Sequence, residues 1–289
     1  MSELPEWFRS AIVRGGRSAR VEVDGATVAY TEWGRADRPV LVLIHGGAAH
    51  GGWWDHIAPS FADSWHVLAP SLSGHGDSDH LPSYGVERWA IEVGGVVDAA
   101  TEGFESVALV GHSLGGFVAA ETARRLHRHA PRRALLGIVA LESPEPVAGL
   151  RPGPPGRLTA PSARRFTDPA EALARFDPWP DGPTHDFIVD RVARAGLRRV
   201  EGGWAWKHDP RILREPVPTL GERPVPARVV VVRGENGWVT PERLPRGLPP
   251  GTQIEVIPEA GHHPMLDQPR ALTTALHRIL AQWQEEAER

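Results

Sequence analysis

Short apolar runs recur along this chain and alternate with longer amphipathic stretches. Each run is rich in Val, Ile and Leu and is too short for a buried helix, which is the pattern of parallel strands covered on both faces. The segment 21–33 differs, because it alternates around Asp24-Gly25 and predicts a β-hairpin with a type I′ turn. Buried strands are predicted at 39–45, 65–70, 106–111, 135–142, 227–234 and 252–259.

Helix-length amphipathic segments separate most of these runs. They predict helices at 53–62, 86–101, 114–128 and 266–286. Strands that alternate with helices favour an α/β fold, in which a doubly wound, mostly parallel sheet carries helices on both faces.

One interval, 143–224, is too long for the single crossover that joins neighbouring parallel strands. We expect an inserted, mainly helical cap there. The α/β core would then consist of 1–142 and 225–289. The first part of the insertion is rich in Pro and Gly, which predicts ordered loop or a lid rather than helix.

The rest of the insertion has clearer local patterns. Residues 168–176 predict a helix, with Asp168 as its cap and Pro169 at its opening position. A second helix is predicted at 186–200, and a turn or short hairpin at 201–210.

Composition narrows the possible functions. Lys and Arg total 32 against 36 Asp and Glu, so the net charge of −4 gives no general attraction for nucleic acid or an anionic membrane. There is no cysteine, which excludes disulfides, a thiolate nucleophile and a cysteine zinc site. The 14 histidines include no His-x-x-x-His pattern, so no metal is expected.

The start of the chain carries no secretory signal pattern, and no stretch of about 18 apolar residues suggests a membrane span. We therefore expect a cytoplasmic protein. The sequence holds no signal for its oligomeric state.

The pentapeptide 111–115, Gly-His-Ser-Leu-Gly, carries the strongest chemical signal. It lies between an apolar run and an amphipathic helix, as the G-x-S-x-G nucleophile elbow requires, and this context argues against a chance match in a loop. Ser113 is the predicted nucleophile. The free backbone N–H of Leu114 at the start of the helix can stabilise developing negative charge, as half of an oxyanion hole.

A general base for Ser113 is expected after the last apolar run, where "IPEAGHHPMLDQP" contains two adjacent histidines. His262 is the predicted base. His263 would face away and is interpreted as a pocket or packing residue, and surface histidines without a catalytic role are the alternative.

These motifs together resemble the α/β-hydrolase-fold proteins. The resemblance rests on 45–47 (His-Gly-Gly), 71–79 (SLSGHGDSD), the elbow and 260–269 (AGHHPMLDQP), in that family's order. It covers nearly the whole chain and is weakest in the insertion. One departure is Ser71, where many relatives carry Asp; a structural difference is expected.

The resemblance implies three further assignments. The Gly47 N–H would be the second oxyanion donor, with Ala48 the next candidate. His45 would be a structural hydrogen-bonding residue. No cofactor would be needed.

The catalytic acid is missing from its usual place. In most relatives it lies three residues beyond the glycine that ends the strand before the last, which here is Gly237. Glu235 is a nearby alternative. A subset that includes the haloalkane dehalogenases carries the acid at the end of the strand after the nucleophile helix, where this chain has Glu142. Glu142 is therefore the predicted acid; the alternative is that it only binds loop amides.

The predicted nucleophile is serine rather than aspartate, which disfavours a dehalogenase or an epoxide hydrolase. We expect a serine hydrolase that cleaves a small apolar ester or lactone through an acyl-enzyme. Trp179, Trp204 and Trp206 are candidates for lining the pocket, with plain packing as the alternative. The same triad could serve a thioesterase, a C–C bond hydrolase or a perhydrolase, and a non-catalytic small-molecule receptor is the alternative of another class.

Overall fold

The computed structural model describes residues 4–101, 106–130, 133–144, 164–178, 182, 184–213, 223–245 and 247–289. Its centre is an eight-stranded sheet with the order β1-β2-β4-β3-β5-β6-β9-β10. The strands are β1 (Arg17–Val23), β2 (Ala26–Trp33), β3 (Val40–Ile44), β4 (His66–Pro70), β5 (Val107–His112), β6 (Leu135–Leu141), β9 (Val229–Gly234) and β10 (Gln253–Ile257).

Strand pairing confirms the predicted fold class. Every pair from β4 to β10 is parallel, whereas β1 with β2 and β2 with β4 are antiparallel. The predicted hairpin is also confirmed: β1 and β2 are joined through Asp24 at φ 49° and Gly25 at φ 80°, and a type I′ turn needs positive φ at both positions.

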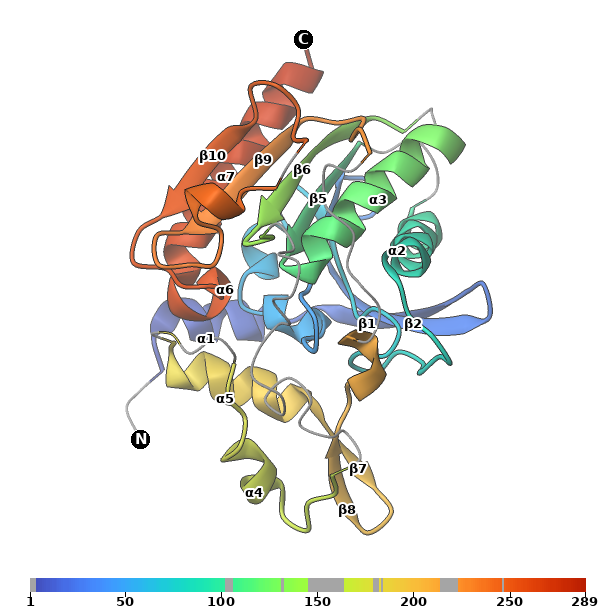
Figure 1. The fold of residues 1–289 in the computed structure, drawn as a ribbon, viewed down its shortest axis with the longest axis vertical. Coiled ribbons are helices and arrows are strands. Elements are labelled where there is room, and N and C mark those ends of the chain that lie inside the picture. The colour runs from blue at the N-terminus through green and yellow to red at the C-terminus, as the bar shows by residue number, and fades with distance from the viewer. Residues whose placement is uncertain are drawn as a thin grey trace.

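Helices cover both faces of the sheet, as Figure 1 shows. On one face, α2 (Val86–Ala100) and α3 (Leu114–His129) pack on inward side chains such as Val40 and Val42. On the other face, α1 (Glu6–Val13) and α7 (Pro269–Ala287) contribute to a second hydrophobic cluster, which includes Leu41 and Leu43. Alternate residues of one central strand thus serve two cores, which is why that strand reads as a continuous apolar run.

Two predicted helices have different limits in the structure. Where one α-helix was predicted at 53–62, the structure has two short 3₁₀ helices, η1 (Gly51–Trp54) and η2 (Ala58–Ser60). Pro59 lacks the N–H that a continuous helix would need. The helix predicted at 266–286 is divided into α6 (Pro264–Asp267) and α7, because Pro269 disfavours helical geometry at Gln268.

Most of the described insertion, residues 164–178 and 184–206, lies together at the lower end of Figure 1, beyond the carboxyl ends of the parallel strands. Asp168 caps the predicted first helix by accepting a hydrogen bond from the Ala170 N–H at 2.8 Å. The elements are α4 (Pro169–Leu173), α5 (Asp186–Ala195), β7 (Leu197–Val200), β8 (Gly203–Trp206) and η3 (Pro210–Leu213). The division of the chain into a core and a separate cap stays a prediction.

The helix predicted at 186–200 was too long. It ends at Ala195, and residues 197–200 form a strand that pairs with β8. The hairpin turn includes Gly202 at φ 79°, a conformation that suits glycine. Trp179 and all but the first two residues of the Pro- and Gly-rich segment 143–161 lie outside the described residues.

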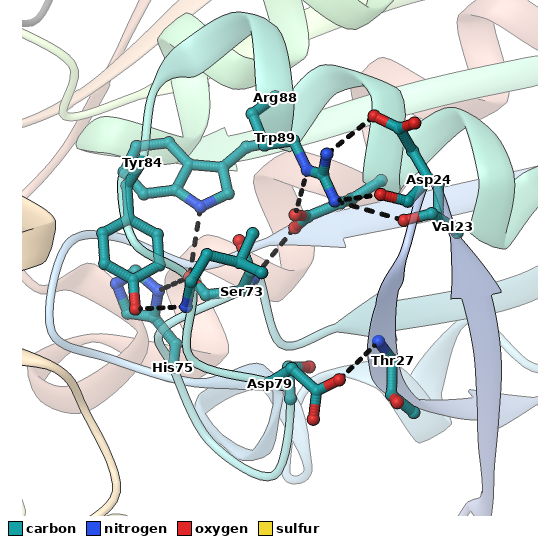
Figure 2. A network of polar contacts seen from close by, with 12 residues as sticks. Val23, Asp24, Thr27, Ser73, His75, Asp79, Tyr84, Arg88 and Trp89 are labelled. Carbon is teal, nitrogen blue, oxygen red and sulfur yellow. Dashed lines mark hydrogen bonds and ion pairs between the residues drawn. The ribbon is translucent and has the colours of Figure 1, made fainter.

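A buried polar network fixes the loop after β4 against α2 and the β1–β2 turn (Figure 2). The fully buried Glu92 carboxylate accepts hydrogen bonds from the Ser73 N–H at 2.8 Å and from Arg88 Nε at 3.2 Å. Arg88 also contacts Asp24 at 2.7 Å, and the Trp89 indole donates to the Ser73 carbonyl at 3.1 Å. These contacts connect the loop to α2, and Arg88 connects α2 to the β1–β2 turn.

Candidate active site

Ser113 occupies a sharp turn between β5, which ends at His112, and α3, which begins at Leu114. Its φ of 51° and ψ of −116° are unusual for a residue with a side chain. Hydrogen bonds to the Ser113 backbone hold this strained geometry: its N–H donates to the Leu141 carbonyl at 2.9 Å, and its carbonyl accepts from the Ser143 side-chain hydroxyl at 2.9 Å. The strand–turn–helix context that the elbow motif requires is present.

The two motif glycines permit a very close crossing of strand and helix. A Cβ on Gly111 would lie 2.1 Å from the Gly115 carbonyl oxygen, and one on Gly115 would lie 2.5 Å from the Ile44 carbonyl oxygen. Side chains at either position would push α3 away from the sheet and move the serine.

The structure brings together the three residues predicted as a triad. His262 Nε2 is 3.2 Å from Ser113 Oγ, and His262 Nδ1 is 3.0 Å from Glu142 Oε2. The His262 ring and the Glu142 carboxylate are both buried. A proton on Nδ1, donated to the carboxylate, leaves Nε2 free to accept the serine hydroxyl proton.

The Glu142 carboxylate also binds two backbone amides of the loop that follows β9. Oε1 accepts from the Gly234 N–H and Oε2 from the Trp238 N–H, each at 2.8 Å. The amide contacts that sequence analysis considered as an alternative to His262 therefore accompany the His262 contact. Together they give a buried charge the partners it needs.

Gly237 is where most relatives would carry the acid, and here its neighbour fills that volume. A Cβ on Gly237 would lie 2.2 Å from Glu142 Oε1 and 2.5 Å from Glu142 Cδ. The other candidate, Glu235, is exposed, and its carboxylate accepts the Glu259 N–H at 2.9 Å. The carboxylate against His262 thus comes from the end of β6.

The predicted oxyanion donors lie on either side of the serine. Leu114 is the first residue of α3, where backbone N–H groups have no partner within the helix. The loop after β3 contains Gly47 and reaches Ser113 through Gly46, since a Cβ on Gly46 would be 3.3 Å from Ser113 Cβ. Both predicted donors therefore belong to segments that adjoin the serine.

His45 has two backbone partners, which is the structural role that the sequence predicts. Its Nδ1 donates to the Gly46 carbonyl at 2.7 Å, and its Nε2 accepts from the Leu72 N–H at 3.1 Å. Burial lowers the pKa of His45 to about 3, so the ring stays neutral. Ser71, the departure from the family pattern, accepts the Gly51 N–H at 3.1 Å.

Comparison with known proteins identifies the family. The model described as "Alpha/beta hydrolase family" matches residues 41–275. The chain belongs to the alpha/beta hydrolase family.

Relatives within this family differ in what they are named for. The "Serine hydrolase-like protein" of Danio rerio is 24% identical over 311 residues, covering 96% of this chain and 92% of the relative. The "Pimeloyl-[acyl-carrier protein] methyl ester esterase" of Methylococcus capsulatus is 30% identical over 196 residues, covering 68% of this chain and 65% of the relative. The names of these two relatives indicate no single substrate.

Solved structures give the same fold. The "Thioesterase Domain From Curacin Biosynthetic Pathway" superposes with a TM-score of 0.72 at 22% identity, over 92% of this chain and 99% of that chain. "E-2-(Acetamidomethylene)succinate Hydrolase" gives a TM-score of 0.71 at 22% identity and the same coverage. At these identities the likeness establishes the fold alone.

Within the described residues, none of this hydrolase's helices combines the length and the apolar character needed to span a bilayer.

Two residues beside the triad were missed by sequence analysis. His112 Nε2 donates to the His262 backbone carbonyl at 2.8 Å, and burial followed by the nearby His262 and His263 holds the pKa of His112 well below its ordinary value. Asp267 Oδ2 accepts the Gly261 N–H at 2.7 Å. Both therefore hold the loop that carries the histidine. The available sequence signal was position, because His112 lies within the elbow motif 111–115 and Asp267 within the motif 260–269.

One group of side chains in the described part of this hydrolase has the spacing for a metal ion, although the sequence predicted none. His112, His262 and His263 each place one ligand nitrogen within 4.8 Å of the others. Both ring nitrogens of His262 already have partners, Glu142 and Ser113. A metal ion there would have to displace one of those contacts and would compete with proton transfer.

A pocket lies between the loop after β3 and the described part of the insertion. Trp206 lines it together with Phe176, Gly47, Ala48 and His263. The predicted pocket role of Trp206 thus has a structural basis, and the same ring packs beside Phe176 with centroids 5.4 Å apart. Trp204 packs instead against the small apolar cluster of the insertion.

Proposed function

We propose that this family member is a serine hydrolase that cleaves carboxylic esters or lactones through an acyl-enzyme. The observation that carries the proposal is the continuous line of contacts from Glu142 through His262 to Ser113, at 3.0 Å and 3.2 Å. In this proposal Ser113 is the nucleophile, His262 the general base and Glu142 the acid that orients it.

The proposed reaction has two halves. Ser113 Oγ attacks the substrate carbonyl carbon while His262 Nε2 takes the hydroxyl proton. The resulting oxyanion is stabilised by the N–H groups of Gly47 and Leu114. His262 then gives the proton to the leaving alcohol oxygen as the C–O bond breaks, which leaves Ser113 acylated.

Water completes the cycle. His262 removes a proton from the water that attacks the acyl-enzyme carbonyl, and returns it to Ser113 Oγ when the acid leaves. Throughout, Glu142 accepts the Nδ1 proton of His262 in a hydrogen bond and balances the charge of the imidazolium.

An insertion that covers the site would select the substrate. We therefore also propose that 143–224 acts as a cap on a core made of 1–142 and 225–289. The pocket supports this, because the described insertion residues Phe176 and Trp206 line it together with Gly47 and Ala48 of the core.

The experiment is active-site labelling joined to turnover. The purified protein is treated with a fluorophosphonate probe and assayed on oxygen esters of increasing acyl length, lactones and thioesters. Ser113→Ala should lose labelling and at least about 10³-fold in kcat, because removing a triad nucleophile typically has an effect of that size or larger. Ser60→Ala, an exposed serine, is the matched control.

Two outcomes would contradict the proposal. Robust turnover by folded Ser113→Ala protein would exclude the acyl-enzyme on this residue. Turnover of thioesters alone would show that the protein is a thioesterase that uses the same triad, and not a hydrolase of oxygen esters or lactones.

A further inference from the structure

The pocket beside the candidate oxyanion loop has two kinds of wall. Trp53, Phe176 and Trp206 contribute apolar surface. The charged groups that line it are Arg175 and Lys207, against one acid, Asp177. The sequence predicted a small apolar substrate, and a pocket with two permanent positive charges is not the environment such a substrate needs.

One wall of the pocket is formed by the loop that carries the proposed oxyanion donor. Gly47 and Ala48 line it, and they follow Gly46, whose backbone lies against Ser113. Ser113 itself does not line the described pocket, so an acyl group attached to it would pass Gly47 and Ala48 to enter. The basic side chains would meet the far end of that group.

Lys207 contributes a largely buried side chain to the pocket wall. The Lys207 ammonium contacts Asp77 at 2.9 Å, and 15% of its side chain is exposed. Asp77 comes from the core loop and is 57% exposed at its side chain, so water screens much of that pair.

Arg175 is held only loosely by its own neighbour. Its guanidinium lies 3.4 Å from Glu171, one helical turn earlier, and the two side chains are 52% and 42% exposed. An exposed pair of this kind contributes little to stability. The guanidinium can turn to a ligand without a large loss.

We propose that the substrate carries a carboxylate at the far end of a short apolar acyl chain, and that Arg175 and Lys207 bind that carboxylate. The aromatic side chains would cover the methylene groups between the ester and the anion. This rests on the proposed function for the position of the ester carbonyl, and it makes the substrate a half-ester of a dicarboxylic acid or a molecule of that shape.

The test uses two esters of the same length and nearly the same shape. Monomethyl adipate ends in a carboxylate, and methyl hexanoate ends in a methyl group. The expected result is a kcat/KM for monomethyl adipate about 10-fold or more above that for methyl hexanoate, falling as salt is added. Methyl adipamate, with a neutral amide, should behave like methyl hexanoate.

Variants assign the effect to the two basic residues. Arg175→Gln and Lys207→Gln should each lower kcat/KM for monomethyl adipate about 10- to 100-fold, the usual range for a charged hydrogen bond, and change methyl hexanoate less than about twofold. Arg164→Gln is the matched control, because Arg164 also contacts Glu171, at 3.3 Å, and does not line the described pocket.

The proposal is overturned if the two esters react equally well, or if Arg175→Gln and Arg164→Gln have the same effect. Failure of the proposed function is distinguished by calorimetric titration of Ser113→Ala protein with adipate and with neutral adipamide. Binding of adipate alone, lost in the Arg175→Gln background, would support the anion site even if no ester were cleaved. No binding of adipate would exclude the site.

Discussion

The end of β6 and the loop after β9 offer two places for a carboxylate beside His262, and they compete for one small volume. At β6, Glu142 extends into that volume and contacts His262 at 3.0 Å. At the β9 loop, Gly237 leaves the volume open, and a Cβ there would lie 2.2 Å from the Glu142 carboxylate. A side chain at one position therefore excludes a long acidic side chain at the other. The glycine at 237 thus indicates the position of the acid as clearly as the glutamate at 142 does.

The largest expected effect comes from removing the charge at β6. Glu142→Gln should keep the fold, because an amide can retain part of the contact with the loop, and should lower kcat on the order of 10³- to 10⁴-fold, since His262 would lose its tautomer control and its counter-charge. Steady-state kinetics on an active ester measures this. Glu235→Gln is the matched control, and its kcat should stay within about twofold of the unmodified protein. A larger loss in Glu235→Gln than in Glu142→Gln would show that Glu235 is the catalytic acid.

A smaller loss is expected from filling the volume at the β9 loop. Gly237→Ala should displace the Glu142 carboxylate or the loop, lowering kcat about 10²-fold, since small displacements of catalytic groups have effects of that size. Overpacking should also lower the free energy of unfolding by about 1–3 kcal/mol in denaturant titration. Gly94→Ala is the control, because a Cβ on Gly94 meets nothing within 4 Å. Full activity of Gly237→Ala would mean that the volume is not shared.

Moving the acid from one region to the other tests the exclusion directly. Gly237→Asp in a Glu142→Ala background should recover about 10-fold of the activity lost by Glu142→Ala alone, because the shortened residue frees the space that an aspartate would use. A Glu142→Gln background should not allow this rescue, since glutamine fills the same space. Equal recovery in both backgrounds would contradict the shared volume.

The smallest expected effect is a change in how stability depends on pH, to which the charge of Glu142 contributes through Asp267. Burial, with the Glu142 charge as a lesser cause, raises the pKa of Asp267 from 3.8 to about 6. A raised carboxyl pKa means that the folded state binds this proton more tightly, so its contribution to stability is present at low pH and is lost as pH rises through about 6.

Thermal unfolding between about pH 4 and 7 measures this contribution. Asp267→Asn should flatten the fall in Tm over that range. Glu142→Gln should shift the fall to lower pH, because one cause of the raised pKa is gone. An unchanged pH profile in Asp267→Asn would show that Asp267 is not the titrating group.

Much of the fold was predictable because its signals are local. The parallel strands, α2 and α3 follow from apolar periodicity, and the β1–β2 turn follows from Asp24-Gly25. The helix predictions were wrong at two places. Pro59 lies in the short 3₁₀ helix η2, where one long α-helix was predicted. Residues 197–200 were predicted as the end of a helix, but they form a strand paired with β8. Short segments of that kind take their conformation from the partner they meet.

The sequence by itself determined the fold class, the serine on its strained turn and the histidine after the last strand, since each depends on residue types at fixed spacing. It also predicted Glu142 as the acid, with Glu235 as another candidate and binding of loop amides as another role for Glu142. Tertiary structure alone decided which carboxylate lies against His262, that His112 and Asp267 hold the histidine loop, and that Arg175 and Lys207 line one pocket. These are contacts between segments distant in sequence, and only the packed chain sets the distances on which hydrogen bonds and charge interactions depend.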